Sequence, residues 1–274
     1  MLRTATEQPQ PLYDPSEANP AYHLRYTWTG WPSQHKFEQT PVELLHRIEP
    51  LWEEDGIRLL EHRWTDEMVQ LLFSAKPNVS PLLLATRAKG RLDHAIRTAG
   101  LHMPLSRKFA VRSVGNNTTH EVEAYIERQV GKEEFVDDRF AELMATFTLT
   151  NDKVDLSRPS GSLRGRYWYN LHVVLVTAER FRVVDKQRLA SIRDWSLKIA
   201  KKKAYSISRL SVMPDHLHLA LRGDYAHPPD QIASAFQNNL AYALGKQRIW
   251  CDSFYVGTFG EYNMEAIRRK LKSR

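Results

Sequence analysis

Two histidines in the segment 213–221 (MPDHLHLAL) have the type and spacing of a metal-binding pair. A β-strand points successive side chains to opposite faces, so a strand here puts His216 and His218 on one face and the intervening leucines on the other. The leucines can pack in a core while the imidazoles, about 7 Å apart along the strand, face a common space. Neutral imidazoles at this spacing can bind a divalent metal if a third ligand completes the site. Taken alone, the pair also fits a strand edge with two half-exposed histidines.

A second candidate group lies about a hundred residues earlier, in the segment 115–129 (GNNTTHEVEAYIERQ). Thr118 and Glu121 form a capping-box pattern that predicts a helix running to about Val130. Tyr125 and Gln129 are four residues apart, so they share one face of that helix. A phenol with an unperturbed pKa near 10 is a poor nucleophile at neutral pH, so a catalytic role would require activation. The alternative is a packed tyrosine and a solvated glutamine.

The elements that must position these groups are predicted to occur twice. Each half has the order β-α-β-β-α-β followed by a helix, which is the ferredoxin-like order. Tyr22 aligns with Tyr169, and Pro81 and Pro229 begin corresponding helices. We expect an α+β fold of two ferredoxin-like repeats packed as a pseudo-dimer within one chain. The expected parts are a flexible arm at 1–20, a first repeat at 21–130, a linker with a possible helix at 131–166 and a second repeat at 167–274.

The two repeats lack complementary groups. The histidine pair of the second repeat aligns with Met68 and Gln70 of the first, so the first repeat lacks the imidazoles. Tyr125 lies ten residues after Gly115, and the residue ten after Gly260 is Lys270, so the second repeat lacks the tyrosine. Each repeat thus retains the groups that the other lacks, and the mirror positions Met68, Gln70 and Lys270 have neither imidazole nor phenol.

These motifs together resemble the HUH single-tyrosine transposases, which include the TnpA-type enzymes of the smallest insertion sequences and the REP-associated tyrosine transposases. The resemblance covers roughly residues 22–130 and 167–272, in two copies. It implies a single-stranded DNA substrate, with hairpin-bearing element ends, and a divalent metal, Mg²⁺ or Mn²⁺. In this family a tyrosine attacks the scissile phosphate and becomes joined to the 5′ phosphate. In dimeric members the tyrosine helix of one subunit completes the histidine site of the other.

Carried over to this chain, the resemblance implies a single site with Tyr125 as the nucleophile. The metal ligands would be His216, His218 and Gln129. The metal would act as a Lewis acid on a phosphoryl oxygen.

Neighbouring residues leave alternatives open. Tyr262, two residues after Gly260, is a rival nucleophile, although its position fits the start of a helix. Asp215 is either an acceptor that orients an imidazole or a turn residue after a proline. We expect His172 to be a structural or surface group.

Charge indicates a polyanionic partner. The net charge is +7, which favours nucleic acid. The single Cys251 excludes an intrachain disulfide and fits a reducing cytoplasm, and no apolar run is long enough to span a membrane. The residues expected to contact the DNA backbone are Lys89, Arg91, Arg97, Arg107, Lys108 and Arg112.

The predicted function is a metal-dependent, site-specific single-stranded DNA endonuclease and strand transferase of the transposase type, acting through a 5′-phosphotyrosine. The alternative is a catalytically inactive, transposase-derived DNA-binding regulatory protein, because each repeat has lost half of the catalytic groups. An RNA-binding role is a third possibility, since ferredoxin-like sheets also bind RNA. Self-association beyond the pseudo-dimer is left open.

Overall fold

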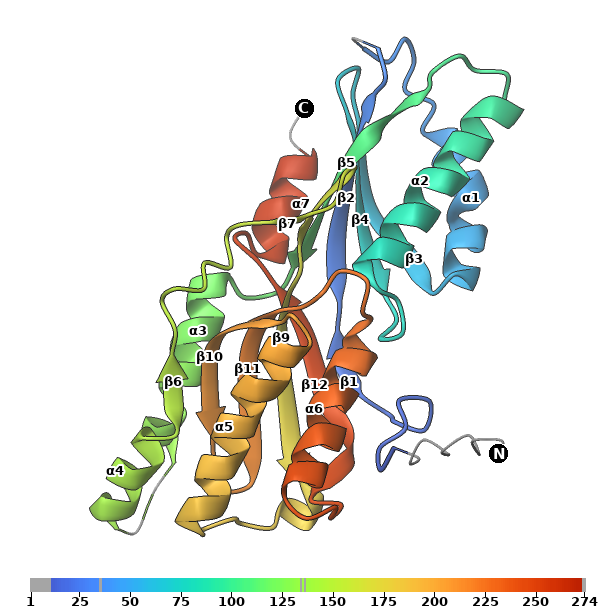
Figure 1. Ribbon diagram of the computed structural model, residues 1–274. Helices are drawn as coiled ribbons and strands as arrows, with labels where there is room; N and C mark the ends of the chain where they lie inside the picture. Colours follow the sequence, from blue (N-terminus) through green and yellow to red (C-terminus); the bar gives the residue numbers. More distant parts are fainter. Residues whose placement is uncertain (1–10, 35, 134, 136, 273–274) are drawn as a thin grey trace, which may run out of the picture.

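The fold is built on two six-stranded β-sheets with helices packed against them (Figure 1). The computed structural model describes residues 11–34, 36–133, 135 and 137–272, so residues 1–10 of the arm predicted at 1–20 lie outside the described residues. The N-terminal sheet has the strand order β3 (Ile57–Trp64), β4 (Val69–Ala75), β2 (Arg25–Pro32), β5 (Leu105–Val114), β8 (Gly165–Trp168) and β7 (Ser160–Gly161). The C-terminal sheet has the order β1 (Ala21–His23), β12 (Trp250–Phe259), β9 (Asn170–Thr177), β11 (His216–Arg222), β10 (Ser206–Val212) and β6 (Thr148–Thr150).

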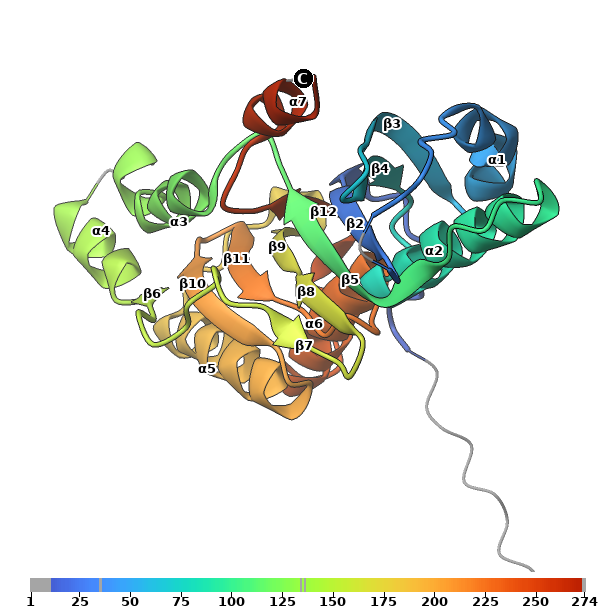
Figure 2. The same cartoon turned by 90° about the horizontal axis from the view of Figure 1, so that it is seen from above.

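Helices cover both faces of each sheet, as Figures 1 and 2 show. On the N-terminal sheet, α1 (Glu43–Glu54) and α2 (Pro81–Thr98) lie on one face and α7 (Met264–Lys272) on the other. On the C-terminal sheet, α5 (Lys186–Lys202) and α6 (Pro229–Ala243) lie on one face and α3 (Thr119–Glu127) on the other. This mixed α+β fold with two sheets is the predicted class. None of the described helices combines the length and the apolar character that crossing a membrane requires.

Four successive strands have the same arrangement in both sheets. In the N-terminal sheet β2, β3, β4 and β5 lie in the spatial order β3-β4-β2-β5. In the C-terminal sheet β9, β10, β11 and β12 lie in the order β10-β11-β9-β12. In both sheets the spatial order of the four strands, numbered by their order in the chain, is 2-3-1-4. A helix follows the first and the third strand of each set.

The sheets meet at a junction whose contacts are reciprocal. Gly115 forms a parallel bridge with Asn263, and Thr118 forms the matching bridge with Gly260. The Ser113 hydroxyl donates to a carbonyl oxygen of β12 at 2.6 Å and accepts the N–H of the first residue of β9 at 3.1 Å. At this junction each sheet therefore contacts the strand end and the following turn of the other.

The matching hydroxyl on the other side is that of Thr258. It donates to a carbonyl oxygen of β5 at 2.7 Å and accepts the N–H of Arg25 at 2.8 Å. Arg25 and Asn170 therefore occupy equivalent positions, each accepted by a hydroxyl from the opposite sheet. The predicted alignment of Tyr22 with Tyr169 is wrong by two residues, because it would move Asn170 out of this position.

The segment 131–166 is more structured than a linker. It contains the expected helix, α4 (Asp138–Ala145), after a 3₁₀ turn, η1 (Val130–Lys132). It also supplies β6, which pairs with β10 at the edge of the C-terminal sheet. The boundary predicted between 166 and 167 falls inside β8, which pairs with β5 before the chain continues into β9 of the other sheet.

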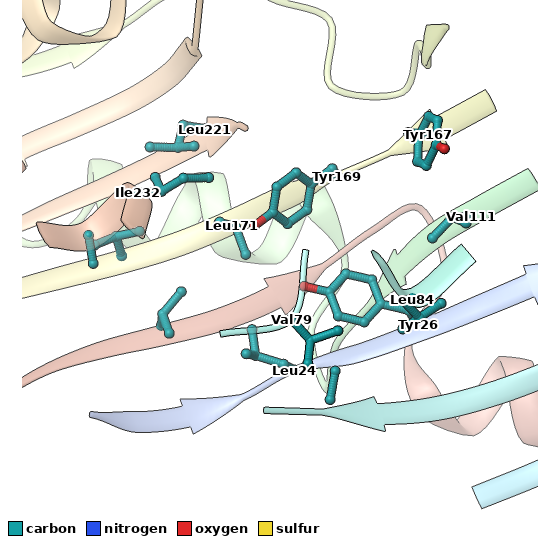
Figure 3. Packing of buried hydrophobic residues seen from close by; sticks show 14 of the residues in the cluster. Leu24, Tyr26, Val79, Leu84, Val111, Tyr167, Tyr169, Leu171, Leu221 and Ile232 are labelled. Atoms are coloured by element: carbon teal, nitrogen blue, oxygen red, sulfur yellow. The ribbon is translucent and has the colours of Figure 1, made fainter. Parts of the chain in front are cut away.

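One apolar core runs through both sheets. Tyr26 of β2 and Tyr169, just before β9, are fully buried, with ring centroids 6.2 Å apart. Figure 3 shows both rings among aliphatic side chains from the two halves. Burying aromatic rings at the crossing of the two sheets fixes the sheets relative to each other.

Candidate functional site

Helix α3 comes from the first half of the chain and packs on the sheet of the second half. Thr118 and Glu121 form the predicted capping box at its start. Val122 and Ile126 of its apolar face are buried in one cluster with Ala220 of β11. The same arrangement recurs with α7, whose buried Ile267 and Leu271 pack with Leu72 of β4 in the N-terminal sheet. Each half therefore donates its last helix to the other half's sheet.

An ion pair joins each exchanged helix to its sheet, and the positions of the positive and negative charges are reversed between the two. Arg209 of β10 contacts Glu127 of α3 at 2.5 Å and Glu123 at 3.9 Å. At the equivalent place of the N-terminal sheet, Glu61 of β3 contacts Arg268 of α7 at 3.5 Å. Arg209 and Glu61 each follow a bulge in the second strand of their set. Because the charges are reversed, α3 would meet a like charge on the N-terminal sheet, which favours the exchanged arrangement.

The C-terminal sheet gathers three histidines on the face that α3 covers. His216 and His218 lie on β11 with ring centroids 4.8 Å apart, and His172 of the neighbouring β9 stacks on His218 at 5.2 Å. Nε2 of His172 and Nδ1 of His218 are 3.0 Å apart. Nδ1 of His216 lies 2.6 Å from Oδ1 of Asp215, whose other oxygen pairs with Arg180 at 3.1 Å. The predicted strand alternation is present, because the alternating Leu217, Leu219 and Leu221 of β11 are fully buried.

Burial keeps two of these imidazoles neutral near neutral pH. It lowers the pKa of His172 to about 4. His218 is only 4% exposed, and burial followed by the charges of His172, His216 and Lys132 lowers its pKa well below the ordinary value. Burial opposes ionisation of Asp215, but hydrogen bonds to His216 and Arg180 outweigh it and lower the pKa of Asp215.

The hydrogen bonds set the orientation of the two β11 imidazoles. Asp215 can accept the Nδ1–H of His216, and a neutral His172 can accept the Nδ1–H of His218 at its own Nε2. In those tautomers the Nε2 atoms of His216 and His218 carry lone pairs. This pattern, with Nδ1 held by a second group, is typical of imidazoles that ligate a metal.

Tyr125 lies directly against this histidine group. Its ring is edge-on to His218 at 5.6 Å and to His172 at 5.9 Å between centroids, and the residue is 38% exposed. Nζ of Lys132 lies 3.7 Å from the centroid of the same ring. The structure therefore brings a solvent-accessible phenol from the first half next to the imidazoles of the second half.

Gln129 lies at the junction of α3 and η1, on the same side of the helix as Tyr125. It is 6% exposed, and its amide nitrogen donates to the Tyr125 carbonyl oxygen at 2.7 Å. Amide carbonyl oxygens are among the donors that bind divalent metals in proteins. In the part of the chain that the structure describes, no cluster of three or more His, Cys, Asp or Glu side chains is arranged to hold a metal.

The positions equivalent to the histidine site lie under α7 and have no imidazole. Gln70 of β4 faces Thr29 of β2, as His218 faces Val174 of β9. Lys270 occupies the place of Tyr125 on the exchanged helix. Tyr262, the rival nucleophile, lines a small cavity with Arg112 and other residues that does not include the site histidines.

The six residues expected to contact DNA lie on α2 and β5, away from Tyr125. Lys89 pairs with Asp93, and Arg91 pairs with the half-buried Asp55 at 3.2 Å, so these two cations have structural partners. The others differ in exposure. Arg97, Arg107 and Lys108 are exposed, and Arg112 lies over the Trp168 ring at 3.5 Å and 3.7 Å from Glu261.

Three residues beside the site were not predicted. His172 was expected to be structural or on the surface, yet it contacts both Tyr125 and His218. Tyr255 of β12 lies 5.7 Å from His172, and Lys132 follows α3 in the segment taken as a linker. Strand alternation in 170–177, which puts His172 on the face opposite Leu171 and Val173, was the one available signal.

We expect His172 to make folding stability depend on pH. Its folded pKa of about 4 lies below the unfolded value near 6.5, so the unfolded chain binds the extra proton between these values. The stability contributed by neutral His172 is present above pH 6.5 and is lost as the pH falls toward 4. Urea unfolding at several pH values should show a shallower acid-side loss in His172→Gln than in the unchanged chain. Parallel curves for the two proteins would contradict this assignment.

Comparison with known proteins identifies the part of the chain that carries the histidine strand. Residues 166–273 match the family model described as "Transposase IS200 like". A solved structure of a candidate transposase from Deinococcus radiodurans R1 is 24% identical over 38% of this chain and 88% of that chain, with a TM-score of 0.30. A REP-associated tyrosine transposase bound to a REP hairpin is 16% identical over 37% of this chain and 61% of that chain, with a TM-score of 0.29. No curated protein matches the chain. The family match confirms the predicted resemblance for residues 166–273, the part of the chain that contains the two β11 histidines.

Proposed function

We propose that this protein is a metal-dependent, site-specific endonuclease and strand transferase that acts on single-stranded DNA. The observation that carries the proposal is the contact of Tyr125, on α3, with His218 and His172 of the C-terminal sheet. A phenol held against two oriented imidazoles is a suitable arrangement for phosphoryl transfer to tyrosine. Hairpin-bearing element ends are the proposed targets, following the family resemblance.

The proposed step transfers a phosphoryl group to Tyr125. The Tyr125 hydroxyl oxygen attacks the scissile phosphorus, a phosphorus–oxygen bond forms, and the bond to the 3′ oxygen of the neighbouring nucleotide breaks. The phenolic proton passes to solvent, and the departing 3′ oxygen takes up a proton. The 5′ end is left as a phosphotyrosine, which conserves the bond energy, so attack by another 3′ hydroxyl can rejoin the strand.

The proposed metal ligands are His216, His218 and Gln129. The proposed donor atoms are Nε2 of each histidine and the side-chain amide oxygen of Gln129. The Nδ1 atom of His216 faces Asp215, and that of His218 faces His172. A bound Mg²⁺ or Mn²⁺ would supply Lewis-acid stabilisation of charge on a phosphoryl oxygen.

We further propose that the chain is a fused pseudo-dimer of two ferredoxin-like repeats. The support is the shared strand order, the reciprocal bridges at Gly115 and Gly260, and the exchange of α3 and α7. The exposed Arg97, Arg107 and Lys108 remain proposed contacts for the DNA backbone. A reducing cytoplasm is the proposed compartment, on the argument from the single cysteine.

Replacing Tyr125 by phenylalanine tests the proposal. We expect incubation of the unchanged chain with single-stranded element ends and Mn²⁺ to give a covalent protein–DNA adduct on a denaturing gel, and Tyr125→Phe to give none, since the attacking oxygen is absent. Tyr262→Phe is the matched control, because Tyr262 is also exposed but lies outside the histidine site. An adduct that persists in Tyr125→Phe contradicts the proposal. DNA binding without any adduct in the unchanged chain would favour the alternative of an inactive, DNA-binding regulator.

A further inference from the structure

The face of the N-terminal sheet under α7 is the counterpart of the active-site face. Strands β2, β3, β4 and β5 correspond to β9, β10, β11 and β12, and α7 lies over them as α3 lies over the histidines. The two faces are therefore similar in backbone shape. They differ in the side chains at matching positions.

The counterpart face has gained positive charge at positions that are neutral in the active-site face. Equivalent positions are identified from the strand register, or from the number of residues that separates them from the junction glycines Gly115 and Gly260. The substitutions are Arg25 for Asn170, Arg63 for Ser211, Arg112 for Gly257, Lys270 for Tyr125 and Arg269 for Ala124.

The exchanged helices differ in the same direction. Arg268 and Lys272 of α7 occupy the places of Glu123 and Glu127 of α3. Burial first, and then the charge of Arg268, lowers the pKa of Arg25, so two guanidinium groups act on each other here. Lys108 is an exposed residue of the same strand, β5, four positions before Arg112.

Carboxylates lie beside two of these cations. Glu61 pairs with Arg268 at 3.5 Å, and Glu261 lies 3.7 Å from Arg112. Glu265 is on the first turn of α7. A sheet face that concentrates guanidinium and ammonium groups beyond its carboxylates is suited to a polyanion.

We propose that this cationic face, formed by Arg25, Arg63, Lys108, Arg112, Arg268, Arg269 and Lys270, binds the phosphodiester backbone of a DNA single strand without cleaving it. The inference rests on the proposed function, because the strand would lie as the substrate strand lies on the related active-site face. It gives the inactive half a role: one face cuts a strand while the other holds a second strand. Holding two strands at once suits an enzyme with a single site that must join two ends.

The salt dependence of binding measures these contacts. We propose to titrate the full-length chain into fluorescein-labelled oligodeoxythymidine at several salt concentrations and to follow fluorescence anisotropy. The test variant is the triple Arg63→Gln, Lys108→Gln, Arg269→Gln. The matched control is the triple Lys186→Gln, Lys201→Gln, Lys202→Gln on α5, which covers the opposite face of the other sheet.

Each phosphate contact in single-stranded DNA contributes about 0.7 to the slope of log affinity against log salt. We therefore expect the slope of the test variant to fall by about 2. The α5 control should keep the slope of the unchanged chain, and a charge-conserving triple (Arg63→Lys, Lys108→Arg, Arg269→Lys) should keep it as well. An unchanged slope in the test variant, an equal fall in the α5 control, or an equal fall in the charge-conserving triple would overturn the proposal.

The two proposals fail separately. Tyr125→Phe should keep the slope of the unchanged chain, because it removes no cation. If no adduct forms at Tyr125 but the slope still depends on the cationic face, the nuclease proposal fails and the binding face stands. If the adduct forms and the slope is the same with and without these cations, only the proposal of a DNA-binding face is contradicted.

Discussion

Replacing His218 by alanine is expected to abolish the covalent adduct, with a loss of rate greater than about 100-fold. His218 contacts Tyr125, and its Nδ1 lies 3.0 Å from Nε2 of His172, which orients its Nε2 as a donor. Removing even a group that orients a metal ligand typically costs about 10- to 100-fold, and removing the ligand itself should cost more.

Gln70→Ala is the matched control for this prediction. Gln70 occupies the position of His218 in the other sheet, and its amide nitrogen donates to the Thr29 hydroxyl at 3.4 Å. We expect adduct formation to be unchanged in this variant. Because His218 is buried, circular dichroism melting curves and a second variant, His218→Gln, are needed to separate loss of folding from loss of chemistry. A folded His218→Gln protein with an unchanged adduct rate would contradict the assigned role.

Replacing Gly115 by alanine is expected to destabilise the protein by about 3 kcal/mol or more. A Cβ at position 115 would lie 2.1 Å from the carbonyl oxygen of Thr258, and a Cβ at position 260 would lie 2.3 Å from that of Ser113. Both obstacles are backbone atoms, so only a shift of one sheet against the other could relieve the overlap. The same shift would move α3, and with it Tyr125, away from the histidines.

Thermal and urea unfolding of Gly115→Ala measure this effect. Gly90→Ala is the matched control, because Gly90 lies in α2 with open space around its Cα. Alanine is a better helix former than glycine, so Gly90→Ala should be neutral or stabilising by up to about 1 kcal/mol. If Gly115→Ala unfolds at the same urea concentration as the unchanged chain, the close approach of the two sheets is not required for stability.

Local patterns predicted the histidine strand and the tyrosine helix well. Alternation in 216–221 separates buried leucines from histidines whatever the partner strands are, and the capping box at Thr118 needs only local hydrogen bonds. The proximity of Tyr125 to His218 was predicted from the complementary loss in the two halves. This proximity requires α3 to pack on the sheet of the other half. The ion pairs of Arg209 with Glu123 and Glu127 provide a physical reason for that packing.

The remaining features depend on contacts between distant segments. His172 is a single histidine in an apolar strand, and only the pairing of β9 with β11 makes it a neighbour of His218. β6 is three residues long and joins the sheet because β10 offers it an edge, which its own sequence does not signal. The alignment of Tyr22 with Tyr169 relies on residue identity alone. The junction hydroxyls, which no local pattern predicts, instead place Arg25 in the position equivalent to Asn170.

Mixing two inactive variants tests most directly whether one chain pools its surviving groups into one site. Tyr125→Phe keeps the imidazoles, and His218→Gln keeps the phenol. If α3 docks within its own chain, an equimolar mixture should form no protein–DNA adduct, as each variant alone forms none. An adduct that appears only in the mixture would show that phenol and imidazoles come from different chains, and would contradict the single-chain composite site.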